Sequence, residues 1–127
     1  IAFLFPGKIR LADSLVATGF PTEREKQLPM ALKQIEAVAP RVRNVRASGS
    51  AALHMAYVAA GRLTGFWEVN LNPWDLAAGA LLVQEAGGRV TSMEGEPYGL
   101  NVRNVVATNG RIHDELMGVL SSSETSF

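Results

Sequence analysis

Apolar residues recur along the chain at two spacings, one typical of strands and one typical of helices. Residues 1–5 are apolar and lead into Pro6-Gly7, and residues 13–18 form a second apolar run that ends at a Gly-Phe-Pro segment. Short apolar runs bounded by Gly and Pro are typical of strands. We therefore expect a strand at each of these two runs.

A helix is predicted between Thr22 and Pro40. Thr22 and Glu25 have the spacing of a capping box, and apolar residues follow at helical intervals up to Val38. Proline has no N–H to donate within a helix, so Pro29 interrupts this pattern. The helix is therefore expected either to begin at residue 27 or 28 or to be kinked at Pro29.

The rest of the chain repeats strand and helix. Strands are predicted at residues 42–47, 64–69, 89–92 and 102–108. Helices are predicted from Ser48-Gly49-Ser50 to residue 60, from residue 73 or 74 to Gly87-Gly88, and over residues 112–120. This alternation predicts a layered α/β domain over residues 1–120, with a largely parallel sheet flanked by helices, followed by a flexible polar tail over residues 121–127. In such sheets ligands bind beyond the carboxyl ends of the strands.

Composition narrows the class of protein. A chain of 127 residues with 47% hydrophobic and 19% charged residues suits one globular domain. With 12 basic and 12 acidic residues there is no net charge, so we expect neither a nucleic-acid nor a membrane partner. No apolar stretch reaches the roughly 18 residues of a transmembrane helix, and residues 1–5 lack signal-peptide features. The absence of cysteine excludes disulfides and thiolate metal sites and fits a cytoplasmic protein.

The first candidate for chemistry is the segment from Arg46 to Ala51, where a predicted strand runs into a helix. Gly49 lets the backbone approach a ligand closely, and the free N–H groups of the first helical turn attract an anion or a sugar hydroxyl. Ser50 can add a hydroxyl group and Arg46 a charge-assisted hydrogen bond. An ordinary N-cap formed by Ser48 or Ser50 is the commoner explanation of such a segment.

Two carboxylates are the next candidates. Glu68 ends a predicted strand, where it can accept hydrogen bonds from a polyol, although a solvated strand end is commoner. Asp75 lies in the first turn of the most apolar helix, where the helix N-terminus alone stabilises a negative charge. As a functional residue, Asp75 would supply a hard oxygen ligand to Mg²⁺. One aspartate does not make a metal site, and Glu85 lies three turns further along the same helix.

Other chemistry has little support. His54 and His113 fall within predicted helices without the spacing of a zinc site, so we interpret both as surface or partly buried helix residues. The aromatic residues Tyr57, Phe66, Trp67 and Trp74 are most simply explained by packing in the core or at an interface. The chain contains neither a nucleophile elbow nor a phosphate-binding loop of the GxxxxGK type.

Taken in order, four segments resemble the carboxyl-terminal half of the inositol monophosphatase family. They are residues 46–53, 57–68, 73–79 and 84–88, and the likeness spans about residues 11 to 118. The Trp-Asp-Leu-Ala-Ala-Gly segment, followed by Glu-Ala-Gly-Gly, matches that family's second signature. The resemblance implies the layered sugar-phosphatase fold, hydrolysis of a sugar or polyol phosphate with Mg²⁺, and a homodimer.

The resemblance also implies roles for individual residues. Asp75 matches an aspartate that binds both metal and substrate, and Glu68 matches a carboxylate that binds a hydroxyl group. Arg46 matches an arginine near the active site and the dimer contact. The helix-start residues that would contact the polyol are Gly49, Ser50 and Ala51.

The family's first signature, Asp-Pro-[Ile/Leu]-Asp-Gly-Thr, is absent from this sequence. In the family, that signature and an upstream glutamate supply most metal ligands. We therefore expect the chain to be half an enzyme that holds no catalytic residue of its own and has negligible phosphatase activity when isolated. The substrate stays open among inositol phosphate, fructose bisphosphate, histidinol phosphate and phosphoadenosine phosphate. The alternatives are a non-catalytic interaction module and a regulatory module associated with RNA or ribosomes, although the zero net charge argues mildly against direct RNA binding.

Overall fold

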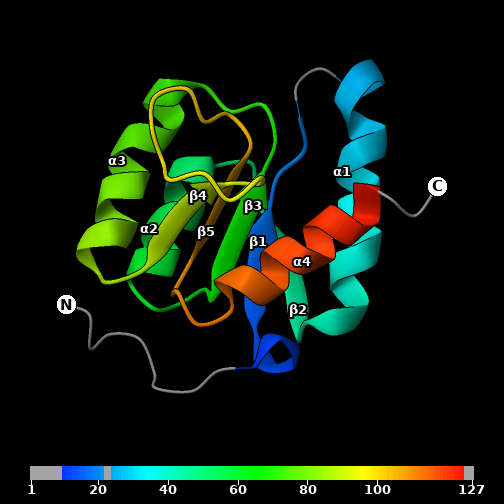
Figure 1. Ribbon diagram of the computed structural model, residues 1–127, viewed down its shortest axis with the longest axis horizontal. Helices are drawn as coiled ribbons and strands as arrows, with labels where there is room; N and C mark the ends of the chain where they lie inside the picture. Colours follow the sequence, from blue (N-terminus) through cyan, green and yellow to red (C-terminus); the bar gives the residue numbers. More distant parts are fainter. Residues whose placement is uncertain (1–9, 22–23, 125–127) are drawn as a thin grey trace.

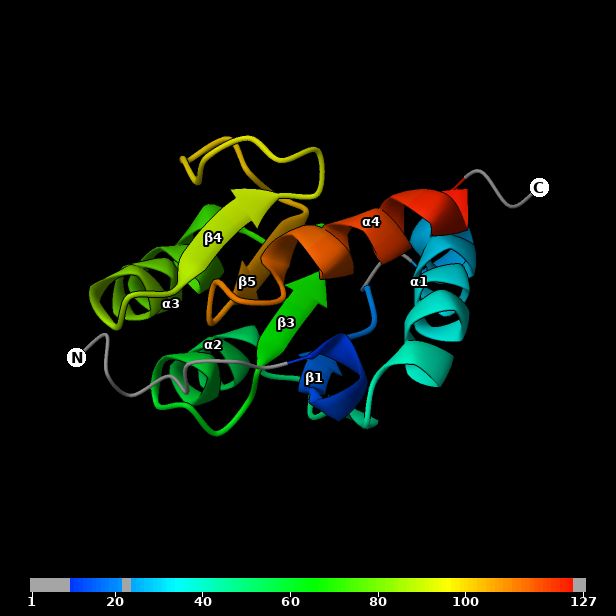
Figure 2. The ribbon, with the colours of Figure 1, turned by 60° about the horizontal axis from the view of Figure 1, so that its bottom comes forward.

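A computed structural model of the protein describes residues 10–21 and 24–124. A twisted sheet separates two layers of helices, with α2 and α3 on one face and α1 and α4 on the other (Figures 1 and 2). The strands are β1 (Leu15–Thr18), β2 (Asn44–Ala47), β3 (Gly65–Glu68), β4 (Arg89–Ser92) and β5 (Val105–Thr108). The helices are α1 (Arg24–Val38), α2 (Ala51–Ala59), α3 (Pro73–Glu85) and α4 (His113–Glu124), with 3-10 turns η2 (Leu11–Asp13) and η3 (Ala39–Arg41).

The sheet is mixed, with the strand order β2-β1-β3-β5-β4. β1 pairs in parallel with both β2 and β3, whereas β5 pairs antiparallel with both β3 and β4. The predicted α/β class is confirmed, but parallel pairing is confined to one half of the sheet. The reason is that residues 93–104, between β4 and β5, form turns and no helix, so β5 returns antiparallel beside β4.

Residues that alternate along the strands enter two separate cores. Ala17 and Phe66 face α2 and α3, whereas their neighbours Val16 and Trp67 face α1 and α4. This alternation follows from the two-residue period of a strand, and it explains why the central strands are apolar on both faces. No helix of the described residues is both long and apolar enough to cross a membrane.

Helices α2 and α3 approach each other closely at Gly79. A Cβ atom at this position would lie 2.8 Å from both Cβ and Sδ of Met55, closer than such atoms pack. Gly79 is the glycine of the Trp-Asp-Leu-Ala-Ala-Gly segment, so this part of the signature has a packing role. Because α3 is held against α2 at Gly79, its first turn, which carries Asp75, has a defined position.

The helix boundaries differ from the predicted ones at two places. α1 begins at Arg24 and runs through Pro29, so a start at residue 27 or 28 is wrong. α4 continues to Glu124, past residue 120, and Ser123 is buried. The predicted strand at residues 1–5 and the Thr22 cap fall outside the described residues.

The two histidines are buried, contrary to the prediction that they are surface or partly buried residues. His113 is fully buried, with Nε2 2.8 Å from Oγ1 of Thr91 and Nδ1 2.9 Å from Oγ1 of Thr108. His54 is 3% exposed, and its Nε2 atom lies 2.8 Å from Oγ of Ser48. The helical spacing alone could not reveal this, because threonines from β4 and β5 supply the partners of His113.

The buried imidazole of His113 predicts acid sensitivity. Burial, and to a smaller extent the charge of Arg89, lowers the pKa of His113 from 6.5 to about 4. The unfolded chain therefore binds more protons between these pH values, and stability falls as the pH drops from 6.5 to 4, by on the order of 1–3 kcal/mol. Thermal melts across this range should show a steeper fall in Tm for the unsubstituted chain than for His113→Gln. Equal slopes would contradict the assignment.

Candidate functional site

The carboxyl ends of β1, β2 and β3 meet at one edge of the sheet, because these three strands run in parallel. Beyond this edge lies a cavity of about 320 Å³. Its walls are the segments that follow the strands, residues 19–21, 49–52 and 68–72, together with Asp75 from α3. The cavity therefore lies where ligands bind in parallel sheets, beyond the strand ends and beside helix N-termini.

Five of the six candidate residues line this cavity, namely Gly49, Ser50, Ala51, Glu68 and Asp75. They come from the loop after β2, the start of α2, the end of β3 and the first turn of α3. Arg46 is not among the lining residues; it lies on the edge strand β2 with its side chain exposed. The fold thus joins two carboxylates and one helix start that are up to 26 positions apart in the chain.

The start of α2 is both a capped helix and a wall of the cavity. Oγ of Ser50 accepts a hydrogen bond from the N–H of Leu53 at 3.2 Å, so Ser50 is the N-cap. Gly49 has a φ of +81°, and a Cβ atom at this position would meet nothing within 4 Å. Glycine is thus suited to the left-handed backbone of this turn, and the space beside it is open to the cavity. The N–H groups of Ala51 and Ala52, also in the first turn, are directed outward from the helix N-terminus.

Glu68 is a partly buried carboxyl group at the end of β3. Within the described residues its side chain makes no hydrogen bond or ion pair. Burial, and then the negative charge of Asp75, raises the pKa of Glu68 from 4.5 to about 7. A carboxyl group held in this way is prepared to bind a group that restores its lost hydration, such as a ligand hydroxyl or a nearby cation.

Asp75 faces the same cavity from the first turn of α3. The backbone N–H of Asp75 donates to the carbonyl of Asn72 at 3.0 Å, while its carboxylate has no partner among the described residues. Pro73 begins the helix, and the N-cap Asn72 makes no side-chain capping bond. The positive end of the helix dipole therefore stabilises a carboxylate that remains available to a ligand.

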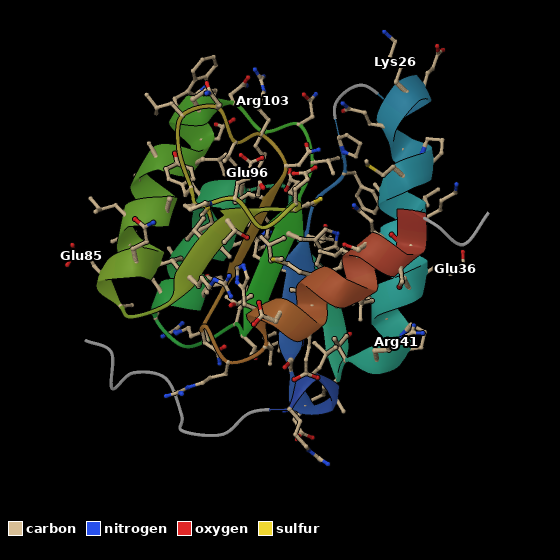
Figure 3. All side chains as sticks on the ribbon, viewed as in Figure 1. Lys26, Glu36, Arg41, Glu85, Glu96 and Arg103 are labelled. Atoms are coloured by element: carbon tan, nitrogen blue, oxygen red, sulfur yellow. The ribbon has the colours of Figure 1, made fainter. Side chains whose placement is uncertain are left out.

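The segment between β3 and α3 is held by the loop before β5, a support that the sequence analysis missed. Asn70 has a φ of +58°, and its N–H donates to Oδ1 of Asn104 at 2.9 Å. The backbone carbonyl of Arg103, a residue labelled in Figure 3, accepts a hydrogen bond from the N–H of Leu71 at 2.9 Å. The guanidinium group of Arg103 donates to Oδ1 of Asn72 at 3.2 Å. The feature of the sequence that could have indicated this turn is Asn-Leu-Asn-Pro at residues 70–73, because asparagine tolerates a positive φ.

The carboxyl groups that line the cavity are of the type that binds a hard cation, but there are too few of them to complete a metal site. Carboxylate oxygens are the ligands that Mg²⁺ prefers, and it commonly takes one or two of them together with water and phosphate oxygens. Residues 10–21 and 24–124 contain no group of three acidic or histidine side chains that could hold a metal ion. Glu85 does not add to the pair, because it lies at the opposite end of α3 with its side chain pointing outward (Figure 3).

The four aromatic residues do not form a single cluster. Phe66 lies in the core beneath α2 and α3, and Trp67 lies in the other core. Trp67 donates through Nε1 to Oε1 of Gln34 at 3.2 Å. Trp74 is 75% exposed and Tyr57 37% exposed. The predicted packing role therefore holds for the two strand residues, whose side chains alternate across the sheet.

The family model of the inositol monophosphatases matches residues 6–125. This chain belongs to the inositol monophosphatase family. The inositol-1-monophosphatase of Synechocystis sp. is 42% identical over 117 residues, covering 92% of this chain and 41% of that protein. The Nus factor SuhB of Salmonella typhimurium is 43% identical over 102 residues, covering 80% of this chain and 38% of that protein.

Solved structures agree with this membership. The inositol monophosphatase from Anabaena (Nostoc) sp. superposes with a TM-score of 0.87 at 38% identity, over 93% of this chain and 47% of that one. The Thermotoga maritima IMPase gives a TM-score of 0.84 at 36% identity, over 95% of this chain and 45% of that one. The chain thus spans less than half the length of these inositol monophosphatases.

The raised pKa of Glu68 predicts that this carboxyl group destabilises the fold at alkaline pH. Between pH 4.5 and 7 the unfolded chain loses the proton of Glu68 before the folded chain does, so stability falls as the pH rises. In buffer with EDTA, Glu68→Gln should raise stability at pH 8 by about 1 kcal/mol, allowing for solvent screening, and by less at pH 5. Melting curves at both pH values measure this difference, and a pH-independent offset would refute it.

Proposed function

We propose that this chain forms the substrate-binding part of a Mg²⁺-dependent phosphomonoesterase that hydrolyses inositol monophosphate or a related sugar or polyol phosphate. The observation that carries the proposal is the cavity at the sheet edge, where Glu68 and Asp75, two carboxylates with no hydrogen-bond or ion-pair partner among the described residues, lie with the capped start of α2. Membership of the inositol monophosphatase family supports a phosphatase. Further support comes from the lining of the cavity, in which carboxyl groups and the first-turn N–H groups of α2 could hydrogen-bond to a polyol and Asp75 could bind a cation.

Each residue of the cavity has a role in this proposal. Asp75 contributes one oxygen ligand to Mg²⁺, and the Glu68 carboxyl group accepts hydrogen bonds from hydroxyl groups of the polyol. At Gly49 the open backbone lets the substrate lie close to the chain, and the first-turn N–H groups at Ala51 donate to its oxygen atoms. The Ser50 hydroxyl caps α2 and so keeps this wall in place.

Bound Mg²⁺ would supply polarisation of the phosphoryl oxygens, a lower pKa for an attacking water and neutralisation of the leaving alkoxide. The described residues offer Asp75 and Glu68 and no third acidic partner. We therefore place the other metal ligands, and the groups that activate water, in an amino-terminal half beyond this chain. The chain's own contribution is to bind and orient the polyol and to fix one side of the metal site.

The proposal extends to assembly and location. We place a homodimer contact near Arg46, whose side chain is exposed on the edge strand β2 and outside the cavity. The neutral charge balance fits a protein that meets small molecules and not membranes or nucleic acid. The lack of cysteine fits the cytoplasm.

A second candidate function is a non-catalytic interaction or regulatory module of the same fold. The observation that favours it is the outer face of α3, where Trp74 is 75% exposed and Leu81 58% exposed. Exposed apolar side chains on one helix mark contact surfaces more often than catalytic ones. A relative 43% identical to this chain bears the name Nus factor SuhB.

The isolated chain should release almost no phosphate from inositol monophosphate in the presence of Mg²⁺. Two carboxylates cannot by themselves complete the roughly six-oxygen coordination of a catalytic Mg²⁺. A colorimetric phosphate assay checks this, with the Synechocystis inositol-1-monophosphatase as the positive control. A Mg²⁺-dependent rate close to that of the control would disprove the need for further ligands.

Substitution of Asp75 should remove the weak Mg²⁺ response of the chain. We expect millimolar Mg²⁺ to shift the amide NMR signals of the first turn of α3 in the unsubstituted chain, and Asp75→Asn to abolish these shifts because the amide is a poorer ligand. Asp114→Asn is the matched control, since Asp114 is exposed and bonded to Arg89 at 2.8 Å, away from the cavity. An unchanged response in Asp75→Asn would argue against the assigned ligand.

A further inference from the structure

Gly19 lies against the carboxyl group of Glu68. It is the residue that follows β1, and it lines the same cavity as Glu68. A Cβ atom at position 19 would overlap Oε1 of Glu68 and lie 2.6 Å from its Cδ atom. The carboxyl group therefore occupies the space that any side chain at position 19 would need.

The backbone does not explain the glycine at this position. Gly19 is absent from the residues with positive φ, so its conformation is open to alanine. Gly49, across the cavity, is the opposite case, with a φ of +81° and nothing within 4 Å of an added Cβ atom. What excludes a side chain at position 19 is the carboxyl group of Glu68.

The ends of β1 and β3, where Gly19 and Glu68 lie, are held together by backbone pairing and a side-chain hydrogen bond. β1 and β3 are paired in parallel with Thr18 opposite Trp67, so the next residues are Gly19, just after β1, and Glu68, the last residue of β3. The hydroxyl of Thr18 donates to the carbonyl of Trp67 at 2.7 Å, in a buried position. If a side chain were added at position 19, the end of the flexible Glu68 side chain would move before the backbone did.

We propose that Gly19 is a positioning residue for polyol recognition, because it lets the Glu68 carboxyl group lie back against the end of β1 and leaves the cavity open in front of it. This inference rests on the proposed function, in which Glu68 binds hydroxyl groups of the substrate. Alanine at position 19 would displace the Glu68 carboxyl group from the end of β1 into the part of the cavity that the ligand would occupy. The fold stays intact, because only a side-chain end has to move.

The test uses the ¹⁵N-labelled 127-residue chain titrated with myo-inositol, followed by the amide signals of residues 49–52. We expect Gly19→Ala to weaken binding about tenfold or more, as expected for loss of a hydrogen bond to a charged group, and Glu68→Ala to do the same. The double variant should bind no more weakly than Glu68→Ala alone, because Gly19 acts only through Glu68. Gly118→Ala, with nothing within 4 Å of the added methyl group and far from the cavity, is the matched control.

Two results would overturn the inference. One is a Gly19→Ala variant that binds as tightly as the unsubstituted chain. The other is a loss of affinity from Gly19→Ala that is equally large in the unsubstituted chain and in the Glu68→Ala variant, which is what a purely structural role predicts.

A second measurement separates this inference from the proposed function. NOE contacts between the Gly19 α-protons and the Glu68 γ-protons should be present in the unsubstituted chain, and Gly19→Ala should lose them while its amide spectrum stays dispersed. No myo-inositol binding by the unsubstituted chain would contradict the proposed polyol recognition itself. Absent NOE contacts in a chain that does bind myo-inositol would contradict the role of Gly19 alone.

Discussion

The parallel pairing of β1 with both β2 and β3 is the constraint on which the rest of the structure depends. It brings three strand ends to one edge of the sheet, and with them Gly19, the start of α2 and Glu68. The buried hydrogen bond from Thr18 to the carbonyl of Trp67 ties two of these ends together. The segment after β1 leads to α1 on one face of the sheet, whereas the segments after β2 and β3 lead to α2 and α3 on the other face (Figure 1), and the cavity lies among these segments.

The electrostatics of the cavity follow from the same arrangement. Glu68 lies partly buried at the end of β3, and this burial raises the pKa of Glu68. Asp75, in the first turn of α3, lies near enough to raise the pKa of Glu68 further. The negative charge of Asp75 disfavours ionisation of Glu68, whereas the N-terminus of α3 stabilises the carboxylate of Asp75 itself. Stability is thereby given up at the cavity in which we propose that a polyol and a metal ion bind.

The rest of the domain keeps these groups in position. α2 and α3 are held together at Gly79 and Met55, and the loop before β5 holds the turn at Asn70 through Asn104. On the other face, His113 bonds to threonines of β4 and β5, which locks α4 onto the antiparallel half of the sheet. The antiparallel strands therefore brace a site that is built on the parallel ones.

The sequence by itself determined the elements that depend on local spacing: a capped start of α2 at Ser48 or Ser50, a start of α3 at residue 73 or 74, and a carboxylate in the first turn of α3. The resemblance to the family also implied binding roles for Glu68 and Asp75, which lie on either side of a turn. Only the tertiary structure decided that β5 runs antiparallel, that Arg46 lies outside the cavity and that His113 is buried. It also decided that Gly19 meets Glu68, a contact across 49 positions of the chain. Spacing along the chain determines which residues share a face of one element, whereas contacts between elements depend on which strands become neighbours, and no local pattern encodes that.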